Sequence, residues 1–302
     1  MHLSKDRDMR FKTATANYLS SKQFGSLANS SQKGYENKLN SFCRDTVHGR
    51  TLGNINLDKI NTIVCTELYD TWELETSTSN ANHCSRIFSV LMNYFVARDL
   101  ITKNPMAKVR KRTSEPRSVV WKHDQVVSFL DMAFTRGNWT SIGMIVMMAY
   151  EWAQRPIDIR SLKWENVDLD NQVVKIKQTK RGAKVELPVP DNLNDMLKQQ
   201  ENTWGFQEWV VPHHRPQDNA YRPLTVMQMT HQLKQVKDAV GLPDELQVGD
   251  LRKTAIIEMI LGGAEALAIQ SATGHKNVAS LNPYNKFTLE TARSALDRRQ
   301  RQ

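Results

Sequence analysis

The chain has 302 residues, of which 40% are hydrophobic and 24% charged, so it is long enough for two folded domains. A formal charge of +9 and a pI near 9.4 favour a polyanionic partner such as nucleic acid. The start of the chain is too polar for a signal peptide, and its most apolar stretch, residues 142–152, is too short to cross a bilayer. Three scattered cysteines show no metal-ligand spacing, which predicts reduced thiols in a cytoplasmic protein without a membrane anchor.

The N-terminal part of the chain has the pattern of short helices joined by polar loops. A short amphipathic segment covers residues 11–19, and capping residues at 29–31 precede a second helix. A third apolar stripe covers residues 57–74, and a fourth helix follows the capping residues 76–80. Four short helices without strands predict a small helical bundle for residues 10–104.

A basic segment, residues 105–119, follows the bundle and is the predicted linker. It carries Lys108, Arg110, Lys111 and Arg112, and it ends near a proline that resists helix continuation. Two interpretations stay open for these charges: a solvated surface, or a strap that lies along DNA phosphates.

The second domain, residues 120–302, combines helices with one β-hairpin. Helical periodicity covers residues 124–134 and 140–152, whereas residues 173–189 hold two alternating β-prone runs around a turn with Gly182. Helical patterns return in the last quarter of the chain. The predicted fold class is therefore mainly α with a small antiparallel β-sheet, arranged in two domains.

The second domain carries residues suited to attacking a DNA phosphodiester. His275 follows Gly274, Tyr284 comes nine positions later (284 − 275), and Arg155 and Arg252 stand upstream. A tyrosine phenol needs a proton acceptor to become a nucleophile, and the pentavalent phosphorane carries added negative charge. Arginine suits this charge because its planar guanidinium stays protonated and binds phosphate through two donors. The scheme requires no metal and the sequence offers no carboxylate cluster, so we expect neither a metal nor a cofactor.

In order and spacing, these residues resemble the tyrosine recombinase, or phage integrase, family over about residues 10–290. The resemblance implies that Arg155 and Arg252 bind the scissile phosphate and that His275 donates to it. Tyr284 takes the position of the nucleophile that forms a 3′-phosphotyrosyl bond. Residues 10–104 take the position of the family's core-binding domain, which would close a clamp around duplex DNA with the catalytic domain.

The resemblance also implies two supporting roles. Asp158 takes the acidic position three residues after Arg155, which braces the site. Lys180 takes the position of the hairpin lysine that acts as general acid. Arg181 and Lys184 share its hairpin, so each is an alternative for the reaching cation, and Arg181 is a further candidate for DNA contact.

One position departs from the family pattern. Gly249 stands three residues before Arg252, where the family typically carries a histidine. Glycine has no side chain to accept the tyrosine proton or to bind the phosphate, so we expect a slower but active enzyme. Water, or His213 and His214 from a preceding loop, are candidates to fill the gap.

The implied function is site-specific DNA recombination, as an integrase of a phage or other mobile element. Such an enzyme binds double-stranded DNA at paired sites as a homo-tetramer, cleaves one strand at a time and passes through a Holliday junction. An accessory DNA-bending protein is compatible with this scheme. Three alternatives stay open: a catalytically decayed DNA-binding relative, favoured by Gly249; a type IB topoisomerase-like enzyme; and a chromosome-dimer resolvase.

The two ends of the chain add two expectations. The chain starts about ten residues before its first helix, which resembles compact two-domain members without an arm-site domain. After Tyr284, the residues Phe287, Leu289, Ala292 and Leu296 stand at near-helical spacing. This segment resembles the family's C-terminal exchange helix, which docks on a neighbouring protomer; packing on its own domain is the alternative.

Overall fold

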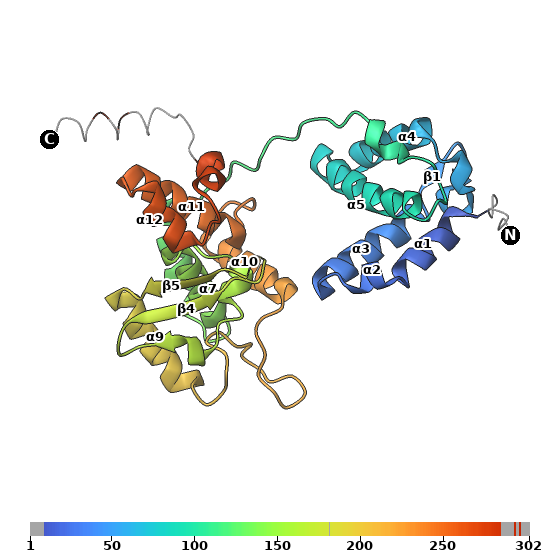
Figure 1. Ribbon diagram of the computed structural model, residues 1–302. Helices are drawn as coiled ribbons and strands as arrows, with labels where there is room; N and C mark the ends of the chain where they lie inside the picture. The colour runs from blue at the N-terminus through green and yellow to red at the C-terminus, as the bar shows by residue number, and fades with distance from the viewer. Residues whose placement is uncertain (1–8, 181, 285–292, 294–295, 297–302) are drawn as a thin grey trace. The chain divides into compact units, whose positions relative to one another are not determined.

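The computed structural model describes residues 9–180 and 182–284, together with residues 293 and 296. The chain divides into two compact units, Met1–Arg117 and Ser118–Gln302, each with a hydrophobic core of its own (Figure 1). Helices dominate both units, and the sheets are small and antiparallel, which confirms the predicted fold class. Within the described residues, no helix is long and apolar enough to cross a membrane.

The first unit is a helical bundle with one short β-ribbon. Its helices are α1 (Phe11–Leu19), α2 (Lys22–Gly25), α3 (Asn29–Phe42), α4 (Thr62–Glu75) and α5 (Thr78–Val96), and 3-10 turns cover Leu52–Asn54, Leu57–Lys59 and Pro105–Lys108. Strands β1 (Thr46–Val47) and β2 (Arg50–Thr51) pair across a turn at His48 and Gly49, whose φ angles are 50° and 73°. The prediction of a bundle without strands is therefore wrong at this ribbon.

The predicted helix over residues 57–74 is also corrected at its start. Asn61 has extended backbone angles, and its side chain accepts hydrogen bonds from the N–H groups of Ile63 and Val64. This cap satisfies donors that a new helix leaves unpaired, so α4 begins only at Thr62. The preceding residues form a separate 3-10 turn.

Aromatic side chains fill the core of the first unit. Phe88 of α5 stacks on Phe11 of α1 with ring centroids 5.6 Å apart, and it meets Phe42 of α3 edge-on at 5.5 Å. Met106 and Val109, which lie within the predicted linker, are buried in the same core. The chain therefore leaves the packed part of this unit only after Val109.

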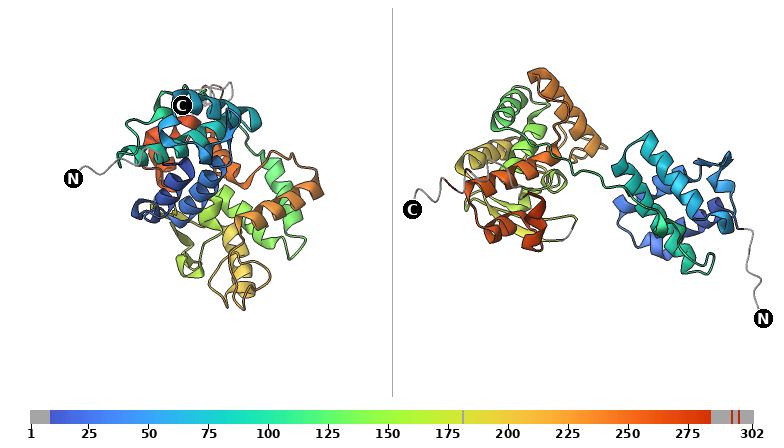
Figure 2. Two further views of the ribbon diagram at one scale, coloured as in Figure 1. Left: turned by 90° about the vertical axis from the view of Figure 1, so that its right-hand side faces the viewer. Right: turned by 90° about the horizontal axis from the view of Figure 1, so that it is seen from above.

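The second unit places helices around a three-stranded sheet. Its helices are α6 (His123–Ala133), α7 (Thr140–Glu151), α8 (Pro156–Ile159), α9 (Asp191–Trp204), α10 (Val226–Val240), α11 (Val248–Gly262) and α12 (Ala266–Thr273), with 3-10 turns at Trp164–Asn166 and Val278–Tyr284. The strands β3 (Val167–Asp168), β4 (Val173–Lys177) and β5 (Lys184–Pro188) are antiparallel, in the order β3-β4-β5. Helix α6 packs on α7 and α10, and α12 packs on β5, as Figures 1 and 2 show from three sides. Helix α9 and strand β3 are additions to the predicted elements.

The predicted β-hairpin is confirmed, and it carries Lys180. Strands β4 and β5 pair from Val173 opposite Pro188 to Lys177 opposite Lys184. Alternate side chains of both strands are buried, as a half-buried hairpin requires. The register leaves residues 178–183 as the connecting turn.

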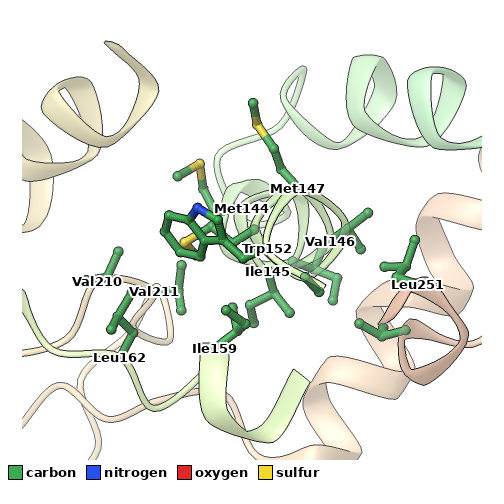
Figure 3. Close-up of a cluster of buried hydrophobic side chains, with 14 of the residues drawn as sticks. Met144, Ile145, Val146, Met147, Trp152, Ile159, Leu162, Val210, Val211 and Leu251 are labelled. Carbon is green, nitrogen blue, oxygen red and sulfur yellow. The ribbon is translucent and has the colours of Figure 1, made fainter. Parts of the chain in front are cut away.

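Helix α7 is the centre of the second core. Its residues from Ser141 to Ala149 are all buried, as expected for a helix that is apolar on every side. Figure 3 shows their side chains leaving the helix in several directions, with Val146 toward Leu251 of α11 and Ile145 toward Ile159 of α8. One helix therefore holds the two elements that carry Arg252 and Arg155.

Candidate active site

The five residues predicted to be catalytic line one cleft of about 880 Å³ in the second unit. They are Arg155, Lys180, Arg252, His275 and Tyr284. They come from separate elements: the start of α8, the hairpin turn, α11, and the chain that follows α12. The fold thus brings together groups that lie far apart in the sequence, with three cationic side chains among them.

Arg155 stands directly before α8 and is held from two sides. Pro156 begins this helix, and its fixed φ angle suits a first helical position. The Arg155 Nη1 donates to the Gln178 Oε1 at 2.9 Å and lies 3.8 Å from the Asp158 Oδ2. The Asp158 Oδ1 accepts from the Thr179 N–H at 2.7 Å, so this buried carboxylate ties α8 to the hairpin.

Gln178 is a central residue of the site that the sequence analysis missed. Its side chain is fully buried, and its Nε2 donates to the Gln154 Oε1 at 2.7 Å and to the Thr273 carbonyl oxygen at 2.8 Å. With the bond from Arg155, the amide uses both its donor and its acceptor side. The available signal was a polar residue at the end of a buried strand, two positions before Lys180.

The backbone of Gln178 also closes the turn that presents Lys180. The Gln178 N–H donates to the Ala183 carbonyl, and its own carbonyl accepts from the Gly182 N–H, both at 2.8 Å. Gly182 has a φ of +66°, which glycine adopts without strain. Lys180 is exposed and lines the cleft, whereas Lys184 lines a separate pocket beside α12. Arg181 lies outside the described residues.

Arg252 is the most deeply buried cation of the site. Its side chain points from α11 so that Nη2 donates to the Thr273 carbonyl at 2.8 Å. Burial lowers the pKa of this guanidinium to about 10, and the charge of Arg155 acts in the same direction, while Tyr284 and Asp158 oppose the change. At neutral pH the group stays protonated. Its Nη1 has no hydrogen-bond acceptor among the described residues, and it is available to an anion in the cleft.

His275 is fixed by the end of α12. Gly274 ends this helix with a φ of +66°, so the chain turns sharply before His275. The His275 Nδ1 lies 2.6 Å from the Thr273 Oγ1, and its Nε2 lies 3.4 Å from the Arg252 Nη2. The ring centroids of His275 and Tyr284 are 6.0 Å apart, and the interplanar angle is 63°. Imidazole, phenol and guanidinium therefore form one group.

Gly249 occupies the second position of α11, at the wall of the same cleft. A Cβ atom built on Gly249 meets no atom within 4 Å from elsewhere in the described part of the chain, so these residues leave space for the expected histidine. His213 and His214 are not among the described residues that line the cleft. The His213 Nδ1 instead makes a 2.9 Å contact with the Arg215 carbonyl of its own loop. The structure does not bring these two histidines to the gap.

The four basic residues of the predicted DNA strap differ in their surroundings. Lys108, Arg110 and Lys111 are exposed. Arg112 is exposed as well, but it makes ion pairs with Asp70 and Glu73 of α4, and its backbone N–H donates to the Tyr69 hydroxyl at 2.9 Å. Arg112 thus holds this segment against α4 of the first unit, and two carboxylates partly neutralise its charge.

The expected exchange helix with Phe287, Leu289 and Ala292 lies outside the described residues, except for residues 293 and 296. The site described above ends at Tyr284, whose side chain is half-buried beside the apolar cluster of Ile256, Ile269 and Leu281.

The sequence model of the phage integrase family matches residues 120–290, more than half of the chain. The chain belongs to the phage integrase family. The match covers every residue of the cleft named above, from Arg155 to Tyr284. Gly249, where the sequence analysis expected a histidine, also lies within the matched residues.

Curated members of the phage integrase family resemble half of the chain. Tyrosine recombinase XerA of Thermococcus kodakarensis is 24% identical over 156 residues, which are 51% of this chain and 54% of that protein. A shufflon-specific DNA recombinase of Escherichia coli is 27% identical over 162 residues, or 53% of this chain and 38% of that protein. The chain thus spans about half the length of the XerA relative, and less of the other.

Solved structures share the fold over almost the whole chain. A lambda integrase dimer bound to a COC' core site has a TM-score of 0.76 at 16% identity, covering 93% of this chain and 78% of that one. The Tn1549 transposon integrase in complex with a circular intermediate DNA has a TM-score of 0.74 at 18% identity, covering 96% and 99%. A lambda integrase tetramer bound to a Holliday junction has a TM-score of 0.76 at 17% identity, covering 93% and 79%.

Proposed function

We propose that this protein is a site-specific DNA recombinase that cleaves and rejoins strands through a 3′-phosphotyrosyl bond at Tyr284. The observation that carries the proposal is the meeting of Arg155, Lys180, Arg252, His275 and Tyr284 on one cleft. Family membership supports the same reaction class.

Each group has a task in this reaction. The Tyr284 oxygen attacks phosphorus, and the two guanidiniums of Arg155 and Arg252 bind the non-bridging oxygens. Arg252 is suited to this task because its buried Nη1 has no acceptor among the described residues. A fixed cation in a site that excludes water stabilises developing charge more than one in solvent. Lys180 on the exposed turn delivers a proton to the leaving 5′ oxygen.

The phosphotyrosyl bond conserves the energy of the broken phosphodiester, so strand joining is the reverse of cleavage. The scheme uses neither ATP nor a metal ion. Paired DNA sites, a homo-tetramer and a Holliday junction intermediate complete the proposal, and the similarity to a lambda integrase tetramer on such a junction supports it. We propose that the protein acts in the cytoplasm of a bacterial host, on its DNA. There it would integrate or excise a phage or other mobile element, with an accessory DNA-bending protein as a partner.

DNA binding follows from the exposed cations. Lys108, Arg110 and Lys111 are proposed to contact phosphates along the strap, while Arg112, which follows them, holds the segment on α4. The domain limits proposed for this task are residues 10–104 for DNA binding and 120–302 for catalysis.

A recombination assay tests the function. A binding site is first selected from a random duplex library, and two plasmids carrying that site are then incubated with the protein. Recombinant plasmids support the proposal. Relaxation of supercoils without recombinants indicates a topoisomerase-like enzyme instead.

Gly249 favours one second candidate, a relative that binds its site without cleaving it. Such a protein retards the selected duplex on a native gel but leaves no covalent adduct on a denaturing gel. A covalent adduct rules this candidate out.

A further inference from the structure

The hydrogen bonds around Thr273 determine which nitrogen of His275 carries a proton. The Thr273 Oγ1 lies 2.6 Å from the Ile269 carbonyl oxygen and 2.6 Å from the His275 Nδ1. A carbonyl oxygen cannot donate, so the single hydroxyl proton of Thr273 lies in the bond to Ile269. His275 must supply the proton of the other bond. The ring therefore carries hydrogen on Nδ1, and in its neutral form it holds a lone pair on Nε2.

The second nitrogen of His275 faces the reacting groups. The Arg252 Nη2 lies 3.4 Å from the His275 Nε2. A guanidinium can only donate, so this approach suits a lone pair on Nε2 and not a second N–H. Tyr284 lies near the same guanidinium, since it opposes the lowering of the Arg252 pKa that burial causes. The proton acceptor and the phenol thus share one neighbour.

The other position from which a base would be expected is vacant. Gly249 brings no side chain, and a Cβ there meets no atom of the described residues within 4 Å apart from its own helix and chain neighbours. His275 is the histidine among the described lining residues of the cleft. Among the described lining residues, the His275 imidazole and the Asp244 carboxylate can each take a proton at neutral pH without first losing one, and the imidazole is the one in ring contact with Tyr284.

We propose that His275 is the general base of this site, a role that rests on the function proposed above. The Tyr284 hydroxyl proton passes to the His275 Nε2 while the phenol oxygen forms its bond to phosphorus. The bond between phosphorus and the 5′ oxygen breaks, and Lys180 delivers a proton to that oxygen. The new Nε2–H then donates to the phosphorane, and rejoining returns the proton to Tyr284.

Thr273 is the positioning residue for this base. Its side chain is fully buried and orients the ring through Nδ1 without contacting the DNA-facing nitrogen. Thr273→Val removes the hydroxyl at nearly constant volume, whereas Thr273→Ser keeps it. We expect the valine variant to be slower in cleavage and the serine variant to recover most of the rate.

The charged and titratable groups around His275 come from several elements. They are Arg252 on α11, Arg155 before α8, Lys180 and Lys184 on the hairpin, and Lys276 and Tyr284 beyond α12. A pH profile alone therefore mixes several groups, so the test changes the acidity of the phenol itself.

The experiment measures covalent cleavage of the selected site by the full chain, with fluorotyrosine or tyrosine at position 284. His275→Gln keeps an amide that can donate to the phosphate but cannot take a proton. We expect this variant to cleave ~100-fold more slowly than the wild type at neutral pH. Fluorination makes the phenol more acidic and should restore much of the loss, while changing the wild-type rate little.

Two matched controls distinguish the role of His275 as general base from the role of Lys180 as general acid. A DNA with sulfur in place of the bridging 5′ oxygen has a leaving group that needs no acid, so it should rescue Lys180→Ala but not His275→Gln. In the His275→Gln background, Gly249→His should restore cleavage because it supplies another imidazole to open space, whereas Gly249→Ala should not.

The outcomes are distinguishable. If the wild type forms no covalent adduct on DNA that it binds, the proposed function itself fails. If the wild type forms the adduct and His275→Gln does so at the same rate, His275 is not the base. The same conclusion holds if fluorotyrosine leaves the defect unchanged, or if sulfur in the leaving group abolishes it.

Discussion

The Arg155 Nη1 donates to the side-chain oxygen of Gln178 at 2.9 Å, and this neutral amide holds the guanidinium without cancelling its charge. The amide nitrogen of Gln178 donates to the Thr273 carbonyl, which also accepts from Arg252. One glutamine thereby links the two arginines of the cleft.

Gln178→Glu should weaken cleavage by ~10- to 100-fold with little effect on DNA affinity. The new carboxylate would place a negative charge beside the Arg155 guanidinium. It would also lack the amide N–H group that donates to the Gln154 and Thr273 oxygens. An unpaired buried polar group costs about 1–3 kcal/mol, so a lower melting temperature should accompany the change. The control is Gln200→Glu, at a buried amide that donates to the Val210 carbonyl away from the cleft. Equal cleavage by the two variants would show that Gln178 does not position Arg155.

Gly274→Ala should abolish cleavage and destabilise the second unit. Its φ of +66° costs about 1–2 kcal/mol for a residue with a Cβ, and that Cβ would lie 2.7 Å from the Gln178 Nε2. Gly241→Ala is the matched control, because Gly241 also ends a helix with a φ of +69° but has no atom within 4 Å of a built Cβ. Chemical denaturation should show a lower free energy of unfolding for both variants. Cleavage assays should show a lower rate for Gly274→Ala only.

Arg252→Lys should move the alkaline limit of cleavage to lower pH. Burial first, and then Arg155, lowers the pKa of the Arg252 guanidinium to about 10, so the wild type loses this cation only as the pH rises through about 10. A lysine starts from a reference pKa near 10.4, below that of arginine, and the same burial would lower the lysine pKa further. Cleavage by the variant should therefore fall between pH 7 and 9, where the wild-type rate holds. A variant profile parallel to the wild type over that range would contradict this account.

Arg110→Ala should lower DNA affinity more than Arg112→Ala. Each phosphate contact that is lost reduces the salt slope of binding by about 1. Both arginines are exposed, but Arg110 makes no ion pair with the described acidic residues. Arg112 already pairs with Asp70 and Glu73, so its removal changes the charge toward DNA less. Binding titrations at several salt concentrations measure both slopes. A larger loss for Arg112 would place that residue on the DNA.

The sequence predicted the secondary-structure elements that are determined by residues close together in the chain. The hairpin at residues 173–189 follows from alternating side chains around a glycine turn, and β4 and β5 do pair there. The ribbon at Thr46–Thr51 was not predicted because its strands are only two residues long, although His48-Gly49 is a turn signal. The apolar stripe predicted a helix from residue 57, whereas α4 begins only at Thr62 because the Asn61 side chain caps it there.

The candidate site divides in the same way. Arg155, Arg252, His275 and Tyr284 could be selected because their order and spacing are visible in the chain. Gln178 could not, because its partners Gln154 and Thr273 lie 24 and 95 positions away and only the folded chain brings them together. The tautomer of His275 likewise depends on a backbone carbonyl of α12, which no side-chain pattern reveals.

The most direct test of the central claim is covalent trapping on a nicked duplex that carries the selected site and loses its short 5′ fragment after cleavage. The account predicts a protease-sensitive adduct on a denaturing gel for the wild type, with the 3′ phosphate mapped to Tyr284 by mass spectrometry. Tyr284→Phe should bind the same duplex and form no adduct. An adduct with Tyr284→Phe, or one mapped to another residue, would contradict the assignment of Tyr284 as the nucleophile.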